Sequence, residues 1–356
     1  MSGLWQDKLR KIDPYVPGEQ AQIPDLVKLN ANENPYPPSP RVAEVFRTFA
    51  ADDLRLYPNA NATRLKTELA AHHGVSPTQV FVGNGSDDVL ALAFQAFFCS
   101  EQPVLFPDIT YSFYPVWCSL FRTPYETVPL DAQFRINPRD YDRPSGGVLL
   151  PNPNAPTGIA ENRAFLEDIL THNQDCVVII DEAYVDFGAW SCVPLLEKYD
   201  NLLIVQTFSK SRSLAGLRIG VALGSETLIR TLEAVKNSYN SYTMDALTIE
   251  AGAASVEDDS YFRATCRKVM DTRERCAQEF EALGFSVCPS SANFLFVTHP
   301  TARAKDIFLA MRARNLFIRY FDLPRIDNHL RITVGTDDEM DKLLAALREY
   351  LAQTNV

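Results

Sequence analysis

The sequence lacks several signatures that would assign it to a common class of site. Neither GxGxxG nor GxxxxGK[ST] occurs, so the two widespread glycine-rich nucleotide loops are absent. The five histidines show no HExxH or related spacing, and we expect no metal site. The seven cysteines are an odd number without a CxxC pair, so we expect reduced, mostly buried thiols in a cytoplasmic protein.

Positively charged residues are fewer than negatively charged ones. Lysine and arginine number 34 against 45 aspartates and glutamates, which leaves a net charge of −11. Nucleic acids and anionic membranes both require a basic face, so we expect neither as a partner. No apolar run approaches the ~20 residues of a membrane span, and residues 1–20 show no signal-peptide core. Any anionic ligand must therefore be held by a few locally placed cations.

What the chain does contain is a series of short apolar runs separated by helical patterns. Runs of this kind are typical of strands buried on both faces of a parallel sheet, so we predict an α/β domain. The predicted strands lie at 79–86, 103–107, 146–151, 176–181, 202–207 and 219–224.

The pattern changes after about residue 225. Helical segments are predicted at 226–235 and 244–256, followed by a long amphipathic helix over 260–284 that stops at Gly284. Short strands and a final helix over 339–352 follow, which indicates a smaller α+β domain. We predict an N-terminal arm with part of the small domain at 1–41, a large domain at 42–245 and a small C-terminal domain at 246–356.

Polar residues that follow the apolar runs are the candidate site residues, because open parallel sheets bind ligands beyond the carboxyl ends of their strands. GNGSDD (83–88) places the backbone amides of Ser86, Asp87 and Asp88 at a helix N-terminus, where they would form an anion cup. Simple N-capping by Ser86 or Asp87 is the alternative. Asp181 follows four apolar residues, where a carboxylate requires a cation partner unless it only caps the next turn.

Lys210 follows the predicted strand 202–207 and stands among the hydroxyls of Thr207, Ser209 and Ser211. A lysine at such a depth can lose its proton and serve as a Schiff-base lysine, whereas a solvated surface lysine is the simpler interpretation. Pyridoxal phosphate requires a lysine for its aldehyde, an anion for its ring nitrogen, a donor for its ring oxygen, and amides, hydroxyls and a cation for its phosphate. The strand ends supply all of these groups, and pyridoxal 5'-phosphate is the cofactor we expect.

Over nearly its whole length the chain resembles the fold-type I pyridoxal-phosphate aminotransferases, and among them the histidinol-phosphate aminotransferases. The resemblance rests on DPYVPG, LNANENPY, RLYPN, GNGSDD, NPNAPTG, IIDEAYVDF, TFSKSRSLAGLRIG, NFLF and HLRITVG. It implies a mostly parallel central sheet in a large domain with a smaller α+β domain. It also implies a symmetric homodimer.

The resemblance further implies a role for each candidate residue. Lys210 would form the Schiff base and later move the substrate proton, Asp181 would hold the proton on the ring nitrogen, and Tyr184 would hydrogen-bond the ring oxygen. Tyr111 would stack on the ring, and Tyr57 would reach the cofactor phosphate of the neighbouring subunit. The phosphate itself would be surrounded by Ser86, Asp87, Thr207, Ser209 and Arg218, with Asp88 beside them.

One position departs from the family pattern. The family motif reads NPTG, with an asparagine that bonds the ring oxygen, but Ala155 stands there in this chain. Alanine donates no hydrogen bond. Asn154 or Asn152 would supply the donor after a small backbone shift, or Tyr184 would act alone; we favour Asn154.

The resemblance predicts histidinol phosphate and glutamate or 2-oxoglutarate as the substrates. Both carry anions, for which we expect Arg319, Arg331 and Tyr15 to form the binding site, although either arginine could instead be an ordinary strand residue. An aromatic-amino-acid aminotransferase is the main alternative. A phosphothreonine decarboxylase and a non-catalytic ligand-binding module are more distant ones.

Overall fold

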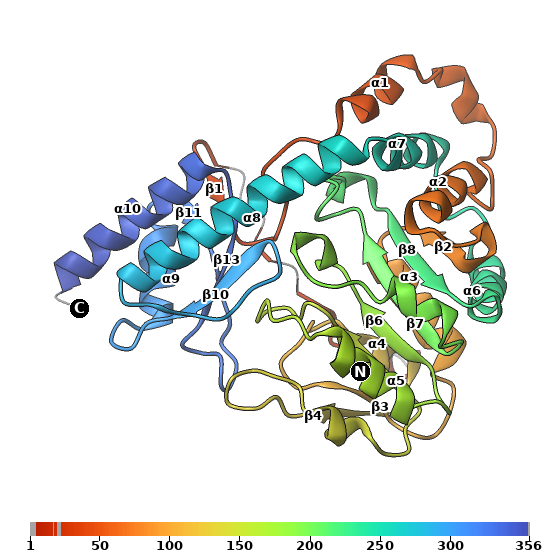
Figure 1. Cartoon of the computed structure of the whole chain (residues 1–356), viewed down its shortest axis with the longest axis horizontal. Coiled ribbons are helices and arrows are strands. Elements are labelled where there is room, and N and C mark those ends of the chain that lie inside the picture. Colours follow the sequence, from red (N-terminus) through yellow and green to blue (C-terminus); the bar gives the residue numbers. More distant parts are fainter. Residues whose placement is uncertain (1–4, 17, 20–22, 355–356) are drawn as a thin grey trace.

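The computed structural model describes residues 5–16, 18–19 and 23–354, which form a larger and a smaller unit (Figure 1). The larger sheet has seven strands, and every neighbouring pair is parallel except the two pairs that involve β8. Its order is β2 (Val80–Gly83), β8 (Gly220–Gly224), β7 (Leu202–Thr207), β6 (Val178–Asp181), β5 (Gly147–Pro151), β3 (Val104–Pro107) and β4 (Tyr125–Val128). The predicted, mostly parallel central sheet is confirmed; β4 was not among the predicted strands.

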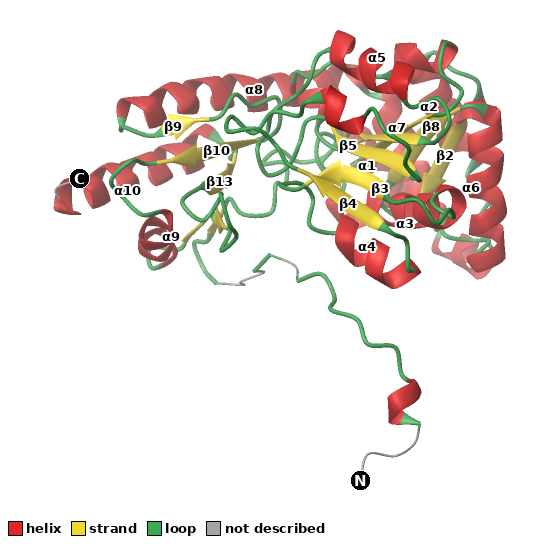
Figure 2. Cartoon of the chain, turned by 90° about the horizontal axis from the view of Figure 1, so that it is seen from below, coloured by secondary structure: helices red, strands yellow, loops and turns green. Residues whose placement is uncertain are grey.

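Both faces of this sheet are covered by helices (Figure 2). Val178 and Ile180 of β6 belong to one buried cluster with α2 (Thr63–His73), α5 (Arg163–His172) and α7 (Ala246–Glu257). Ile179, between them, belongs to a second cluster on the other face with α3 (Ser86–Phe97), α4 (Tyr114–Phe121) and α6 (Glu226–Tyr239). Because successive strand residues point to opposite faces, burial of both explains why the strands read as unbroken apolar runs.

The smaller unit contains a four-stranded antiparallel sheet. Its order is β12 (Arg319–Tyr320), β13 (Leu330–Thr333), β10 (Phe294–Thr298) and β9 (Ser286–Val287), with its core completed by α8 (Asp259–Ala282), α9 (Ala304–Arg312) and α10 (Asp337–Thr354). The N-terminal arm joins this unit, because β1 (Val27–Lys28) pairs in parallel with β11 (Leu316–Phe317). The long predicted helix corresponds to α8, and Gly284 after it has a φ of +88°, the left-handed conformation that ends helices.

The boundary between the units lies later than the predicted residue 246. Ile249 and Val256 of α7 are buried in the core of the large sheet, so α7 belongs to the large unit and the chain crosses to the small one near Asp258. The predicted boundary treated α7 as part of the small domain because its apolar pattern does not reveal which sheet it covers.

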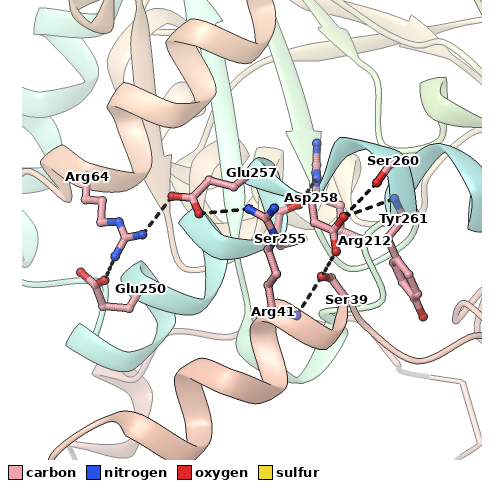
Figure 3. Close-up of polar contacts among 10 residues, drawn as sticks. All are labelled: Ser39, Arg41, Arg64, Arg212, Glu250, Ser255, Glu257, Asp258, Ser260 and Tyr261. Atoms are coloured by element: carbon pink, nitrogen blue, oxygen red, sulfur yellow. Dashed lines mark hydrogen bonds and ion pairs between the residues drawn. The ribbon is translucent and has the colours of Figure 1, made fainter.

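The chain passes between the two units near Ser39 and again near Asp258, and side chains at these two places bind each other (Figure 3). Ser39, just before α1 (Pro40–Thr48), donates a hydrogen bond to Asp258, the N-cap of α8. Arg41 pairs with Glu257 at 3.6 Å, and Arg64 of α2 pairs with both Glu250 and Glu257. These contacts fix where the segment that leads from the N-terminal arm to α1 meets the start of α8.

The remaining described helices are short 3-10 turns at Gln6–Lys8, Ala51–Arg55, Pro77–Gln79, Pro138–Tyr141, Val185–Phe187, Val193–Glu197 and Ala215–Leu217. No helix within residues 5–16, 18–19 and 23–354 is both long and apolar enough to cross a membrane.

Candidate active site

Two adjoining cavities open at the carboxyl ends of the central strands. The inner cavity is lined by Ser86, Asp87, Tyr111, Pro151, Pro153, Ala155, Asp181, Ala183, Tyr184, Thr207, Ser209, Lys210 and Arg218. The outer cavity shares Tyr111, Ala155, Tyr184 and Lys210 with it and extends to Tyr15, Arg319 and Arg331. Residues that are far apart in the sequence therefore meet around Lys210.

Lys210 stands three residues after the end of β7, where the chain has left the sheet. Its Nζ donates a 3.3 Å hydrogen bond to the carbonyl of Ala31 and lies 5.8 Å from the centre of the Tyr184 ring. Asn34 Nδ2 donates to the Lys210 carbonyl at 3.0 Å, which holds the backbone of the turn. The amine is thus presented at the wall that both cavities share.

Asp181 is the last residue of β6 and is only 5 % exposed. Burial raises the pKa of its carboxyl to about 6, while hydrogen bonds from the Tyr114 hydroxyl (2.8 Å) and the Ala183 amide (3.1 Å) favour the ionised form. A cationic group in the cavity would complete this arrangement. Tyr114 was not singled out from the sequence, although it lies three residues after Tyr111, one helical turn away.

Other groups that line the inner cavity could bind an anion. Helix α3 begins at Ser86, after Gly85 in the left-handed region with a φ of 90°. A Cβ on Gly85 would lie 2.5 Å from a terminal nitrogen of Arg218, so only glycine lets the guanidinium approach this closely. Arg218 Nη1 donates to the Ser209 hydroxyl at 3.2 Å, and Thr207 donates to the same hydroxyl at 3.0 Å.

Asp87 connects this anion site to the aromatic wall. It pairs with Arg218 at 3.3 Å, and it accepts a 3.0 Å hydrogen bond from the Tyr111 hydroxyl. Burial, with the charge of Asp87 as a further cause, raises the pKa of Tyr111, so the phenol stays protonated. The Tyr111 ring is therefore held in one orientation against the cavity.

Two predicted cofactor residues lie outside the cavity lining. Asp88 accepts a 2.8 Å hydrogen bond from the Asn84 amide and closes the turn before α3. Asn154 donates its amide to the Ile109 carbonyl at 2.9 Å and to Thr157 at 3.2 Å, so its donor points away from the cavity. Ala155, not Asn154, forms this part of the wall.

In the outer cavity, Arg319 and Arg331 are register partners on the adjacent strands β12 and β13. Arg331 donates to the Asn30 carbonyl at 3.0 Å, but its buried Nε has no hydrogen-bond partner in the part of the chain that the structure describes. Burial lowers the pKa of Arg331, and nearby Arg319 acts in the same direction. Tyr15 reaches the same cavity from the N-terminal arm and stacks on Phe113 at 4.6 Å.

Tyr57 is a third predicted cofactor residue that does not line either cavity. It is 82 % exposed and stacks on Tyr242 at 4.6 Å. Metal ligands do not gather either: within the described ranges, histidine, cysteine and carboxylate side chains form no group of three that could hold an ion.

Comparison with known proteins agrees with this geometry. The family model for aminotransferase class I and II matches residues 24–347. Histidinol-phosphate aminotransferase 2 of Dechloromonas aromatica is 54% identical over 98% of this chain and 99% of its own length, and a histidinol-phosphate aminotransferase of Acinetobacter baumannii strain SDF is 52% identical over 97% of both. The structure of histidinol-phosphate aminotransferase from Sinorhizobium meliloti in complex with pyridoxal-5'-phosphate has a TM-score of 0.81 at 26% identity, covering 92% of this chain and 91% of that one. The chain belongs to the class I and II aminotransferase family.

Proposed function

We propose that the protein is a pyridoxal-phosphate-dependent transaminase that moves an amino group between histidinol phosphate and 2-oxoglutarate in histidine biosynthesis. The residues of the inner cavity fit the cofactor. They offer helix amides, two hydroxyls and Arg218 to a phosphate, and the buried Asp181 carboxyl to a protonated ring nitrogen. Lys210 lines the same cavity, and its amine would bind the aldehyde.

When bound, the cofactor supplies an aldehyde that captures amines and a ring that accepts electrons from the adjacent carbon. Lys210 would hold the aldehyde and would move the proton at the substrate Cα. Asp181 would keep the proton on the ring nitrogen, and Tyr184 would donate to the ring oxygen. Tyr111 would cover the ring, and its hydrogen bond to Asp87, the ion-pair partner of Arg218, holds its orientation.

The observation that carries the substrate assignment is the pair of arginines in the outer cavity. Arg319 and Arg331 lie opposite each other on neighbouring strands, and no ion pair to either is present among the described residues. Two unneutralised guanidinium groups suit a doubly charged phosphate better than a single carboxylate. The same clamp accepts the distal carboxylate of glutamate in the other half-reaction.

We also infer that the active form is a cytoplasmic homodimer. Tyr57 and Tyr242 stack on the surface beside the exposed Leu54 and Leu56, which leaves apolar area uncovered in the single chain. A second copy on this face would bury that area and bring Tyr57 to the phosphate end of its neighbour's cavity.

The test compares amino donors with the purified, cofactor-loaded protein and 2-oxoglutarate. Histidinol phosphate should be turned over with a kcat/KM at least about a hundredfold above that of phenylalanine, because only the phosphate uses both arginines. Equal turnover of the two would favour the aromatic-amino-acid aminotransferase, and no turnover of histidinol phosphate would refute the proposal.

A further inference from the structure

The hydroxyl of Tyr184 has a partner that the sequence analysis did not single out. Asn32 Nδ2 donates to it at 2.9 Å from the segment that follows β1. A phenol oxygen that accepts this hydrogen bond still has its own proton to donate. Tyr184 lines both cavities, so the proton is available to an acceptor placed there.

The orientation of the Asn32 amide decides whether the Tyr184 proton is available to an acceptor in the cavity. If the amide were reversed, its oxygen would face Tyr184 and would accept the tyrosine proton instead. Thr333 opposes that reversal: its hydroxyl accepts from the Asn32 backbone N–H at 2.9 Å and donates to Asn32 Oδ1 at 3.0 Å. Thr333 is only 2 % exposed, so a reversed amide would leave a buried hydroxyl proton without an acceptor, which folded proteins avoid.

The surrounding contacts hold Asn32 itself in place. Asn293 Nδ2 donates to the Asn32 carbonyl at 2.9 Å, and two residues earlier the Asn30 carbonyl accepts from Arg331. Arg331 and Thr333 are alternate residues of β13. This strand therefore carries both an arginine of the proposed substrate site and the residue that bonds Asn32.

Tyr184 has little support from the other side of the cavity. Ala155 cannot donate a hydrogen bond, and the Asn154 amide is already bonded to Ile109 and Thr157. Because neither Ala155 nor Asn154 offers a donor to the ring oxygen, hydrogen bonding to that oxygen depends more on the direction of the Tyr184 proton.

We propose that Asn32, oriented by Thr333, is a positioning residue that keeps the Tyr184 hydroxyl proton directed into the cavity as the donor to the cofactor's ring oxygen. The inference rests on the proposed function, since it concerns how the cofactor is held. In this proposal, Asn32 and Thr333 together compensate for the hydrogen-bond donor that Ala155 lacks.

The test measures the pH midpoint at which the absorbance of the Lys210-bound cofactor changes. A donor to the ring oxygen stabilises the more negative, deprotonated form, so losing it should raise the midpoint. Thr333→Val frees the amide to reverse, and Asn32→Asp replaces the donor with an acceptor; each should raise the midpoint by about one pH unit, a tenfold change in the protonation equilibrium. Thr333→Ser retains the hydroxyl and should keep the wild-type midpoint.

The other titratable or charged groups that line the cavities with Tyr184 or interact with it include Lys210, Asp181, Arg331, Tyr111 and Tyr114, and these variants leave all five unchanged. In a Tyr184→Phe background the donor is already absent, so adding Thr333→Val should produce no further shift. Folded Thr333→Val protein with an unshifted midpoint would overturn the inference, as would an equal shift in Thr333→Ser or an additive one in Tyr184→Phe. Wild-type protein that forms no such absorbance band would refute the proposed function instead.

Discussion

The hydroxyl of Tyr114 donates a 2.8 Å hydrogen bond to Oδ2 of Asp181, in a position where both side chains are buried. This bond favours the ionised carboxyl that a protonated ring nitrogen requires. Tyr114→Phe should therefore raise the pKa of Asp181 further and weaken cofactor binding. Losing a hydrogen bond to a charged group costs about 1.5–3 kcal/mol, or about ten- to hundredfold in the Kd for pyridoxal phosphate.

Fluorescence quenching of the cofactor-free protein measures that Kd. Tyr141→Phe is the matched control, because Tyr141 is equally buried but its hydroxyl has no partner among the described residues. If Tyr114→Phe and Tyr141→Phe bind the cofactor equally well, the bond to Asp181 does not support the site.

Lys210→Ala should still bind the cofactor, but without a covalent link, and should lose transamination by several orders of magnitude. The nucleophile and the proton-moving group disappear together in this variant. Lys198→Ala, which removes an exposed lysine four residues before β7 begins, should retain activity. Borohydride treatment followed by mass measurement reports the link independently of turnover. Near-normal turnover in Lys210→Ala would exclude the assignment.

The carboxyl of Glu182 predicts how stability depends on pH. It is 1 % exposed and accepts hydrogen bonds from the Cys192 amide, Ser191 and Gln206, yet burial raises its pKa to about 7. The unfolded chain has an ordinary glutamate pKa of about 4.3, so the folded state binds more protons between these values. Stability from this group is complete below pH ~4 and is lost as the pH rises through about 7, by up to about 3 kcal/mol.

Urea unfolding of the cofactor-free protein at fixed concentration, from pH 5 to pH 8, should reveal this decline. Asp181, whose pKa is also raised by burial, contributes in the same direction. Glu182→Gln should make the decline shallower, whereas Glu197→Gln, at an exposed position on a neighbouring turn, should leave it unchanged. A slope that is identical in wild type and Glu182→Gln would contradict the assignment.

The sequence predicted the central strands well where both faces are buried, because only such strands give unbroken apolar runs. Strand β4 escaped because it lies at the sheet edge and its first three residues, Tyr125 to Thr127, are exposed. Lys210 and Asp181 were singled out because strand ends converge in parallel sheets, whereas Arg218 was predicted from the family resemblance. Tyr114 and Asn32 were missed, since their roles depend on contacts 67 and 152 residues away in the chain. Asn154 was favoured as the donor that replaces Ala155. The direction in which a loop side chain points cannot be read from composition, so its bonds to Ile109 and Thr157 were not foreseen.

Tyr57 predicts an asymmetry in mixed dimers. A chain that carries both Tyr57→Phe and Lys210→Ala is paired with a wild-type chain, with separate affinity tags to isolate the mixed species. If Tyr57 reaches the neighbouring subunit, the wild-type lysine faces a mutant tyrosine, and the doubly mutant chain lacks its lysine, so both sites are defective. A tyrosine that acts within its own chain would leave one native site. Half of the wild-type activity per mixed dimer would therefore contradict the crossing arrangement.

The two arginines of the outer cavity predict which half-reaction each substitution damages. Arg331 has a buried Nε and donates to the carbonyl of Asn30, the residue before Ala31, whose carbonyl accepts from Lys210, so both substrates should use it. Losing one partner of a desolvated ionic hydrogen bond costs about 2–5 kcal/mol, or roughly thirty- to several-thousand-fold in affinity. Arg331→Ala should incur this loss with glutamate and with histidinol phosphate alike.

Arg319→Ala should behave differently, because the phosphate carries more charge than a carboxylate and can engage a second guanidinium opposite the first. The histidinol-phosphate half-reaction should then lose more than the glutamate half-reaction. Single-turnover measurements of each half-reaction, followed by the cofactor's absorbance, separate the two effects. Arg139→Ala, at an exposed position in the 3-10 turn Pro138–Tyr141 of the large unit, controls for the loss of one positive charge. Equal losses in both half-reactions for Arg319→Ala would remove its phosphate-specific role and strengthen the aromatic-amino-acid alternative.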